Sequence, residues 1–255
     1  MDQTKYDQKL EEFVTIVLAA GQGSRMNSDL PKVLHSLGGK PLLQHVIDNL
    51  IKADCKRIIV VVGYKGEMVM EQIGSEVEYV WQKEQLGTGH AVLQAEESLS
   101  SFQGKIIITC GDVPLIKPET YLLLLKESEA EKVKAVVLTM KQENPTGYGR
   151  IIKDDQGDFL RIVEEKDASE QEKLIKEVNA GVYLFDKGLL FKGLKKVDCD
   201  NAQNEFYLPD ALQSVLKFGW RIKTLPLSHS LEGKGINTKE DLLELENYYK
   251  EQFAE

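Results

Sequence analysis

The segment FVTIVLAAGQGSRM, residues 13–26, places an apolar run directly before a glycine-rich turn. Residues 13–19 carry no charge, as is typical of a strand that is buried on both faces of a parallel sheet. Similar apolar runs occur at 57–63 (RIIVVVG) and 105–110 (KIIITC), and a helical pattern fills 42–53. This alternation predicts an α/β fold of Rossmann-like type, with a mostly parallel sheet and helices on both of its faces.

The second half of the chain departs from this alternation. Strand patterns at 148–153 and 159–165 are joined by DDQGD, a hairpin signal, which predicts a small antiparallel lid beside the core. No repeat or long linker divides the chain, so we expect one domain: a polar leader (1–12), a core (13–237) and a C-terminal helix (238–255). Further strands are expected at 77–81, 133–140, 178–185 and 221–225, and further helices at 88–98, 118–131, 206–218 and 238–252.

The composition excludes several classes of protein. The chain has 255 residues, 42% of them hydrophobic and 29% charged, which is typical of a globular protein with a sizeable core. Its formal net charge of −9 disfavours nucleic acids and anionic membranes as partners. No apolar run approaches the ~20 residues of a membrane span. The polar N-terminus and the odd number of cysteines, without paired spacing, favour a cytoplasmic location with reduced thiols.

The glycine-rich turn is a candidate phosphate site. Gly21 and Gly23 allow backbone N–H groups to approach a ligand, and ligands of α/β sheets bind beyond the carboxyl ends of the strands. The turn lacks the P-loop pattern, and Met26 replaces the third glycine of a dinucleotide fingerprint. Arg25 and Lys32 follow within a few residues, and two cations beside free N–H groups suit a triphosphate.

Two more strand ends carry polar groups. Gln82 follows a short strand, and its amide offers a donor and an acceptor that can match one edge of a uracil ring. Gly87 would allow close approach, and Thr88 is expected to cap the next helix. Asp112 follows the strand at 105–110, where a lone carboxylate is a natural ligand for Mg²⁺ that also binds substrate phosphates. No arrangement of His, Cys and Asp suggests a catalytic nucleophile.

Together these segments resemble the uridylyltransferase (pyrophosphorylase) domain of the bacterial N-acetylglucosamine-1-phosphate uridylyltransferases, within the NDP-sugar nucleotidyltransferases. The resemblance runs in order over about residues 13–245. Its Gly-x-Gly-x-Arg element is shared by many nucleotidyltransferases. The segments LGTGHA (86–91), GYGRI (147–151) and NAQNEFYL (201–208) are far more specific to this family.

The resemblance implies a reaction and a set of roles. UTP and N-acetylglucosamine 1-phosphate would give UDP-N-acetylglucosamine and pyrophosphate, with Mg²⁺ as cofactor. The attacking phosphate is already ionised at neutral pH, so no general base is required. The catalytic residues would be Arg25, Lys32 and Asp112, and Asp112 and Asn237 would hold the metal. The nucleotide would contact Leu18, Ala19, Ala20, Gly21, Gly23, Gln82, Gly87 and Thr88, and the sugar would contact Gly147, Glu164 and Asn179.

The sequence also departs from the family pattern. Cys110 stands where an aromatic residue is common, which bears on the sugar pocket, and Ser24 stands where threonine is common. Bifunctional members continue into an acetyltransferase β-helix, whereas this sequence has no hexapeptide repeats, so we expect no acetyl transfer from acetyl-CoA. Three alternatives stay open: another sugar 1-phosphate (glucose or a variant amino sugar), a cytidylyltransferase, and a non-catalytic sugar-nucleotide sensor. The oligomeric state is open as well.

Overall fold

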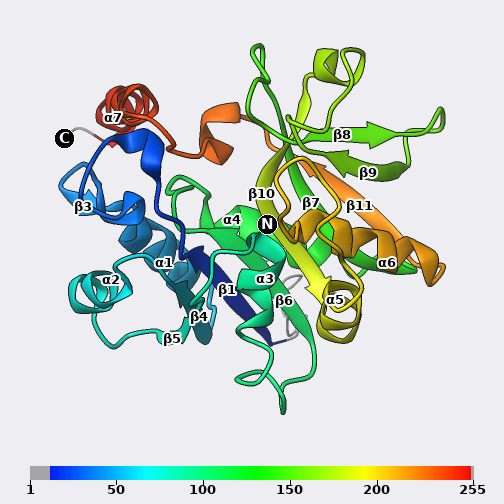
Figure 1. Cartoon of the computed structure of the whole chain (residues 1–255), viewed down its shortest axis with the longest axis horizontal. Helices are drawn as coiled ribbons and strands as arrows, with labels where there is room; N and C mark the ends of the chain where they lie inside the picture. Colours follow the sequence, from blue (N-terminus) through cyan, green and yellow to red (C-terminus); the bar gives the residue numbers. More distant parts are fainter. Residues whose placement is uncertain (1–11, 254–255) are drawn as a thin grey trace, which may run out of the picture.

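The computed structural model describes residues 12–253 and has a nine-stranded mixed sheet at its centre (Figure 1). β1 pairs in parallel with β4 and β6, β4 with β5, and β11 with β7, whereas β10 runs antiparallel to β6 and β7. The predicted mostly parallel sheet is therefore confirmed. In sheet order the strands of the main path are β11 (Arg221–Pro226), β7 (Val133–Lys141), β10 (Glu177–Asp186), β6 (Lys105–Cys110), β1 (Phe13–Ala19), β4 (Arg57–Val62) and β5 (Glu78–Trp81).

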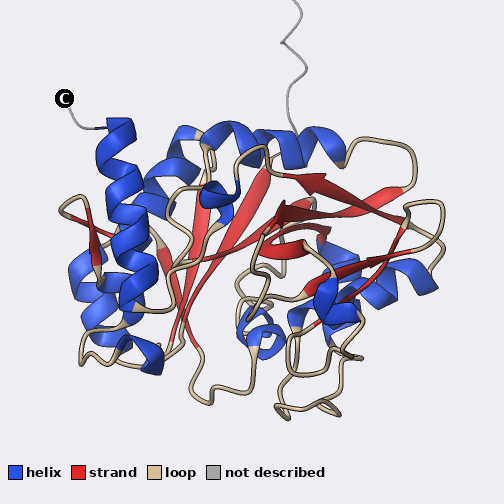
Figure 2. Ribbon diagram, turned by 90° about the horizontal axis from the view of Figure 1, so that it is seen from above, coloured by secondary structure: helices blue, strands red, loops and turns tan. Residues whose placement is uncertain are grey.

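Helices cover both faces of the sheet, as Figure 2 shows. Alternate residues of β1 enter different cores, because successive strand side chains point to opposite faces. Val17 packs in one core, and Ile16 in the other. The first core contains side chains of α1 (Leu42–Lys52), α2 (Gly66–Ile73) and α4 (Pro118–Glu127), and the second contains side chains of α3 (Thr88–Leu93), α5 (Lys187–Leu194) and α6 (Ala211–Lys217).

Three predicted helices are shorter than expected. After α3 the N–H groups of Ala95 and Glu96 bond to carbonyls three residues back, so the α-helical pattern ends before residue 98. After α4 the hydroxyl of Ser128 donates to the Leu125 carbonyl at 2.6 Å, which competes with continued helix. The helix predicted from residue 206 begins at Ala211, after the 3₁₀ turn η5 (Leu208–Asp210). Helices α2 and α5 were not predicted.

The expected hairpin is present. β8 (Arg150–Lys153) and β9 (Phe159–Val163) pair antiparallel, and β8 joins the main sheet through one pairing of Arg150 with Val178 on β10. The turn between the two strands is held by Asp154, whose Oδ1 accepts from the N–H groups of Gln156 and Asp158, both at 2.9 Å. The antiparallel lid is therefore confirmed as a structure beside the main sheet (Figure 1).

The last described element is α7 (Lys239–Phe253). It begins with a capping box, in which the Thr238 hydroxyl accepts from the Asp241 N–H at 3.1 Å and the Asp241 carboxylate accepts from the Thr238 N–H at 2.9 Å. α7 packs beside the small hairpin of β2 (Ser36–Leu37) and β3 (Lys40–Pro41). No helix within residues 12–253 has the length and apolar character that a membrane crossing needs. The leader predicted for 1–12 lies, except for Glu12, outside the described residues.

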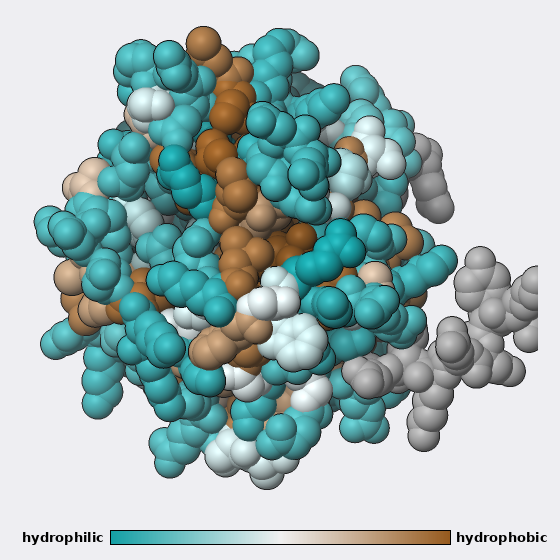
Figure 3. All heavy atoms as spheres, turned by 90° about the vertical axis from the view of Figure 1, so that its right-hand side faces the viewer, coloured by the Kyte–Doolittle hydropathy of each residue, from teal (hydrophilic) through white to brown (hydrophobic). Residues whose placement is uncertain are grey.

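One side of the molecule carries a band of apolar surface between polar borders (Figure 3). It is the side of β8, β9, α6 and the edge strand β11. Exposed large apolar side chains of this region include Leu160, Phe218 and Trp220. Lys192 Nζ lies 3.9 Å from the centre of the Phe218 ring, and Lys134 Nζ lies 5.4 Å from that of Trp220. These cations cover part of the apolar surface.

Candidate active site

A cavity of about 270 Å³ lies beyond the carboxyl ends of the parallel strands. The order of the strands in the sheet reverses at β1, because β4 lies on one side of β1 and β6 on the other. Ligands of open α/β sheets bind at such a point. The loops after the strands are tied to one another: the Gly111 N–H donates to the Leu18 carbonyl at 2.9 Å, and the Gln82 N–H donates to the Val62 carbonyl at 2.8 Å. The cavity is lined by Leu18, Ala19, Ala20, Gly21, Lys32, Val33, Gln82, Gln85, Gly87, Thr88, Ala91, Cys110, Asp112 and Glu205.

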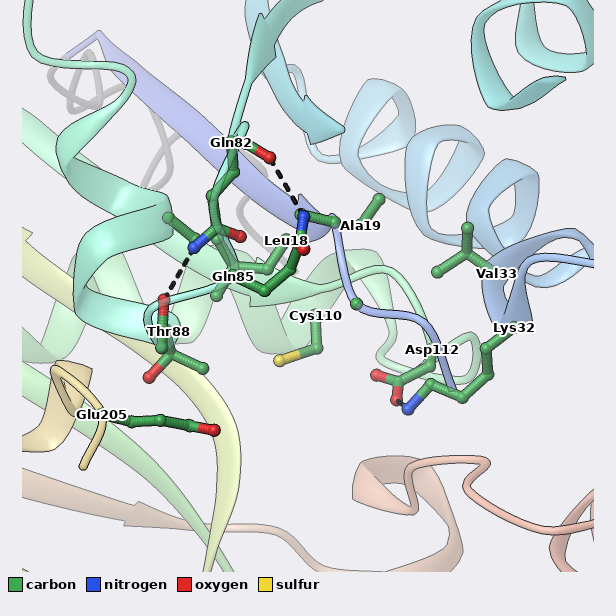
Figure 4. Close-up of a pocket in the computed structure, with 14 residues that line it drawn as sticks. Leu18, Ala19, Lys32, Val33, Gln82, Gln85, Thr88, Cys110, Asp112 and Glu205 are labelled. Atoms are coloured by element: carbon green, nitrogen blue, oxygen red, sulfur yellow. Dashed lines mark hydrogen bonds and ion pairs between the residues drawn. The ribbon is translucent and has the colours of Figure 1, made fainter. Parts of the chain in front are cut away.

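Gln82 and Thr88 lie on one side of this cavity (Figure 4). The Gln82 side chain is 3% exposed, and its Nε2 donates to the Gly87 carbonyl at 3.0 Å. The expectation that Thr88 caps α3 is wrong: Gly87 is the N-cap residue, and the Thr88 hydroxyl instead accepts from the Leu208 N–H at 3.0 Å. Thr88 thus holds the segment before α6 against the cavity.

Gly23 is a predicted nucleotide contact that does not line the cavity. Its φ of +65° is the left-handed region that favours glycine, and a β-carbon there would come within 2.5 Å of Lys32 Cβ. Gly23 therefore lets the turn pack directly on Lys32. We infer that its contribution is to place the lysine.

The two predicted phosphate-binding cations and the two predicted metal ligands form one cluster. The Lys32 ammonium donates to Asp112 Oδ2 and, at 2.9 Å, to Asn237 Oδ1. Arg25 Nη2 donates to the same Asn237 oxygen at 2.9 Å. Figure 4 shows Lys32 and Asp112 pointing toward each other at the opposite side of the cavity from Gln82. The side chains of Lys32 and Asp112 are 17% and 14% exposed, so this ion pair is only partly screened by water.

The oxygens of this cluster suit a hard cation. Asp112 and Asn237 both contact the Lys32 ammonium, so their oxygens converge on one positive charge. Mg²⁺ takes one or two protein oxygens and completes its shell with phosphate oxygens and water. Within residues 12–253 no group of three or more His, Cys, Asp and Glu side chains is arranged to hold a metal. A metal held by Asp112 and Asn237 would therefore complete its shell with water or with oxygens of a bound ligand.

None of the three predicted sugar contacts lines the cavity: Gly147 precedes β8, Glu164 follows β9, and Asn179 is on β10. Asn179, on β10, receives a hydrogen bond at Oδ1 from the Gly181 N–H at 3.0 Å, and its backbone N–H donates to the Gly149 carbonyl at 2.8 Å. Glu164 directly follows Val163, which pairs with Arg150, so it lies beside the same loop. The Gly147 N–H, by contrast, is bound at 3.0 Å by the Glu165 carboxylate. The structure thus brings Asn179 and Glu164 together, whereas the Gly147 N–H already has a protein partner.

Cys110 lies between the cavity and strand β10, which carries the predicted sugar contact Asn179. It lines the cavity, and its Sγ lies 3.7 Å from the Gly181 carbonyl oxygen on the bulge of β10. Burial, with the nearby charge of Asp112, raises the pKa of the Cys110 thiol to about 12. The thiol therefore stays protonated at neutral pH and acts as a small apolar wall.

Other lining residues were not predicted. Gln85 Nε2 donates to the Gln82 carbonyl at 3.2 Å, and Glu205 comes from the segment 201–208 that carries the family resemblance. The sequence did contain a signal for Glu205, because its segment, residues 201–208, is specific to the family and no function was predicted for it. Val33 and Ala91 line the cavity through packing, which no sequence pattern marks.

Glu164, which follows the lid strand β9, has a pKa far above its ordinary value. Its burial, together with the carboxylates of Asp210 and Asp167, raises the pKa of Glu164 to about 7. Between its ordinary value of 4.5 and about 7, the folded protein holds a proton at Glu164 that the unfolded chain has lost. The stability contributed by this raised pKa is complete below pH 4.5 and is lost as the pH rises through 7.

We therefore expect Glu164→Gln to stabilise the protein at alkaline pH. The amide cannot ionise, so the variant should gain up to about 3 kcal/mol in the free energy of unfolding at pH 8 and little at pH 4.5. Urea denaturation at both pH values measures this difference. Glu84→Gln, at an exposed glutamate, is the matched control. An equal change at the two pH values would show that the carboxyl is not held protonated by the fold.

The comparisons with known proteins agree with the fold and show the family. A family model described as nucleotidyl transferase matches residues 14–222, so the chain belongs to the nucleotidyl transferase family. More particularly, the chain is similar to the bifunctional GlmU proteins of Oceanobacillus iheyensis (46% identity over 240 residues) and Bacillus subtilis (42% over 242 residues). These alignments cover 94% and 95% of this chain and 53% of each relative. The chain thus spans about half the length of the curated relatives it matches.

A solved structure supports the fold assignment. The crystal structure of UDP-glucose pyrophosphorylase in complex with UDP-glucose matches with a TM-score of 0.71 and 21% identity. The match covers 94% of this chain and 98% of that one. At this level of identity the likeness establishes the shared architecture.

Proposed function

We propose that this chain transfers the uridylyl group of UTP to N-acetylglucosamine 1-phosphate, giving UDP-N-acetylglucosamine and pyrophosphate in the cytoplasm. The observation that carries the proposal is the cavity at the switch point, with a buried amide at one side and the Lys32–Asp112–Asn237 cluster at the other. The likeness to the GlmU proteins over nearly the whole chain supports this choice of reaction.

In this reaction an oxygen of the sugar phosphate attacks the α-phosphorus of UTP. The new O–P bond forms as the bond between the α-phosphorus and its bridging oxygen breaks, and pyrophosphate leaves with the electron pair. The main barrier is repulsion between two polyanions, so positioning and charge neutralisation supply the catalysis. Lys32 and Arg25 would turn from Asn237 to the β- and γ-phosphates, where they stabilise the leaving group.

Asp112 and Asn237 would hold the divalent cation, for which we propose Mg²⁺. When bound, Mg²⁺ supplies positive charge to the phosphates. Asp112 is well placed for this because its backbone carbonyl accepts from the Ile236 N–H at 3.0 Å, which fixes the segment carrying Asn237 beside it. The two ligands, 125 residues apart by their numbers, are thus held together by the backbone as well as by Lys32.

Gln82 would read the base. Its amide nitrogen is already used inside the protein, so the oxygen is the atom it offers to the cavity. Uracil carries a hydrogen on N3, and an acceptor placed there suits uracil. The backbone at Leu18, Ala19, Ala20, Gly21 and Gly87, with the side chain of Thr88, would enclose the nucleoside.

The lid would bind the sugar. The Glu164 carboxyl group has no hydrogen-bond partner among the described residues, so its oxygens are available to sugar hydroxyl or amide groups. The Asn179 amide can accept or donate hydrogen bonds to the sugar. Gly147 lies on a loop that is held in place by Glu165, which binds the Gly147 N–H and forms a 2.7 Å ion pair with the buried Arg150. Small Cys110 between lid and cavity leaves room at this boundary, so related sugar phosphates are the alternative acceptors to test.

A screen of acceptors tests the proposal. With UTP and Mg²⁺, the protein should release pyrophosphate fastest with N-acetylglucosamine 1-phosphate, and more slowly with glucosamine 1-phosphate and glucose 1-phosphate. The expected reason is that the lid recognises the N-acetyl group. Equal rates for all three would contradict the acetyl selectivity, and no release by folded protein with any acceptor would contradict the reaction itself.

A further inference from the structure

Behind Gln82 lies a second side chain that none of the roles above uses. His90 is in the first turns of α3, and its Nδ1 lies 3.1 Å from Gln82 Nε2. The same Nε2 donates to the Gly87 carbonyl at 3.0 Å. The Gln82 side chain is 3% exposed, so it has little access to water that could replace a lost partner.

These two contacts fix the orientation of the Gln82 amide. The atom beside the Gly87 carbonyl must be the nitrogen, because a carbonyl oxygen cannot donate. Its second hydrogen then points to His90 Nδ1. Both N–H groups are thereby satisfied inside the protein, and the amide oxygen remains for the cavity.

The contacts also assign the proton on His90. Gln94 Nε2 lies 3.2 Å from His90 Nε2 and donates to the His90 carbonyl at 3.0 Å. A neutral imidazole has one acceptor nitrogen, so it cannot accept from both amides. Gln82 is more buried than Gln94 and would lose more by an unsatisfied N–H group. The acceptor is therefore Nδ1, and the ring proton is on Nε2. Gln94 then keeps its hydrogen bond to the His90 carbonyl and does not donate to the ring.

We propose that His90 is a positioning residue that sets the pyrimidine selectivity of the site, by holding the Gln82 amide with its oxygen toward the base. The proposal rests on the proposed function, in which Gln82 faces the base. Uracil presents an N3–H donor to that oxygen, whereas cytosine presents a bare N3 acceptor, which the oxygen repels. Without His90 the amide is held in this orientation by the Gly87 carbonyl alone, so the flipped orientation, with its nitrogen toward the cavity, costs less and the discrimination weakens.

Calorimetric binding of UTP and CTP, with Mg²⁺ and without acceptor, tests this role. The wild-type protein should prefer UTP, and His90→Leu should reduce the UTP-to-CTP affinity ratio about tenfold, since one hydrogen bond of ~1.4 kcal/mol corresponds to that factor. His90→Asn, whose side-chain oxygen can accept from Gln82, should restore much of the ratio. Gln94→Leu is the matched control and should leave the ratio unchanged. Circular dichroism checks that each variant is folded.

The outcomes separate this proposal from the proposed function. An unchanged ratio in folded His90→Leu, with wild type preferring UTP, overturns the role of His90 alone. A wild-type protein that binds both nucleotides equally overturns the base assignment as well. Nitrogen NMR of the wild-type protein with ¹⁵N-labelled histidine adds a readout that needs no variant: His90 should carry its proton on Nε2, and a proton on Nδ1 would contradict the proposal.

Discussion

Replacing Asp112 by alanine should lower kcat on the order of 10²-fold or more and leave the fold intact. Preorganised charges at a phosphoryl-transfer site typically contribute this much. The variant removes one of the two oxygens that converge on the Lys32 ammonium, and with it the carboxylate proposed to hold Mg²⁺. Folding should survive because the side chain is at the rim of the sheet and its backbone carbonyl still bonds to Ile236. Pyrophosphate release at saturating substrates measures the loss.

A carboxylate on an exposed loop provides the control. Asp29 is fully exposed and lies 3.7 Å from the Lys65 ammonium, and Asp29→Ala should keep kcat near the wild-type value. If Asp112→Ala also turned over at a near wild-type rate, its carboxylate would have no part in the reaction.

The second large effect is expected for Lys32→Met. The methionine keeps much of the stem that packs on Gly23 but removes the ammonium. We expect kcat to fall on the order of 10²-fold, because the leaving pyrophosphate loses a cation. Lys32→Arg should retain part of the activity, and Lys65→Met serves as the control for loss of a surface charge. Steady-state rates at varied UTP give kcat and KM separately.

An effect on KM for UTP alone would require a different role for Lys32. It would indicate that the lysine binds ground and transition states equally, so that it attracts the nucleotide without assisting the leaving group. The expected result is a fall in kcat that is at least as large as the rise in KM.

The part of the site that could be predicted lies at strand ends. Gln82 follows β5 directly, and Asp112 follows β6 after one glycine. The parallel pairing of β1, β4, β5 and β6 brings the ends of these strands to one edge of the sheet. Apolar runs mark such strands clearly, so the location of the cavity follows from elementary sheet geometry. The chemistry of the residues suggested a phosphate, a base and a metal role, and the family resemblance added Asn237 and the sugar contacts. The structure shows which of those residues lie together.

Features that depend on side-chain packing were not predictable. The sequence does not show that Gly23 packs on Lys32 or that His90 holds Gln82, because both contacts depend on how a loop or helix lies on its neighbour. Helix α5 was missed because two glycines in KGLLFKGL weaken its helical signal. A signal was present in Asp186, whose side chain caps that helix by accepting from the Gly188 and Leu189 N–H groups.

The most direct test of the central claim follows the α-phosphate of UTP. The protein is incubated with UTP labelled at the α-phosphorus, N-acetylglucosamine 1-phosphate and Mg²⁺, and the products are separated and identified by mass. The label should appear in UDP-N-acetylglucosamine, with an equal amount of unlabelled pyrophosphate. Intact UTP after incubation with folded protein, or label released as UMP without sugar attached, would contradict the claim.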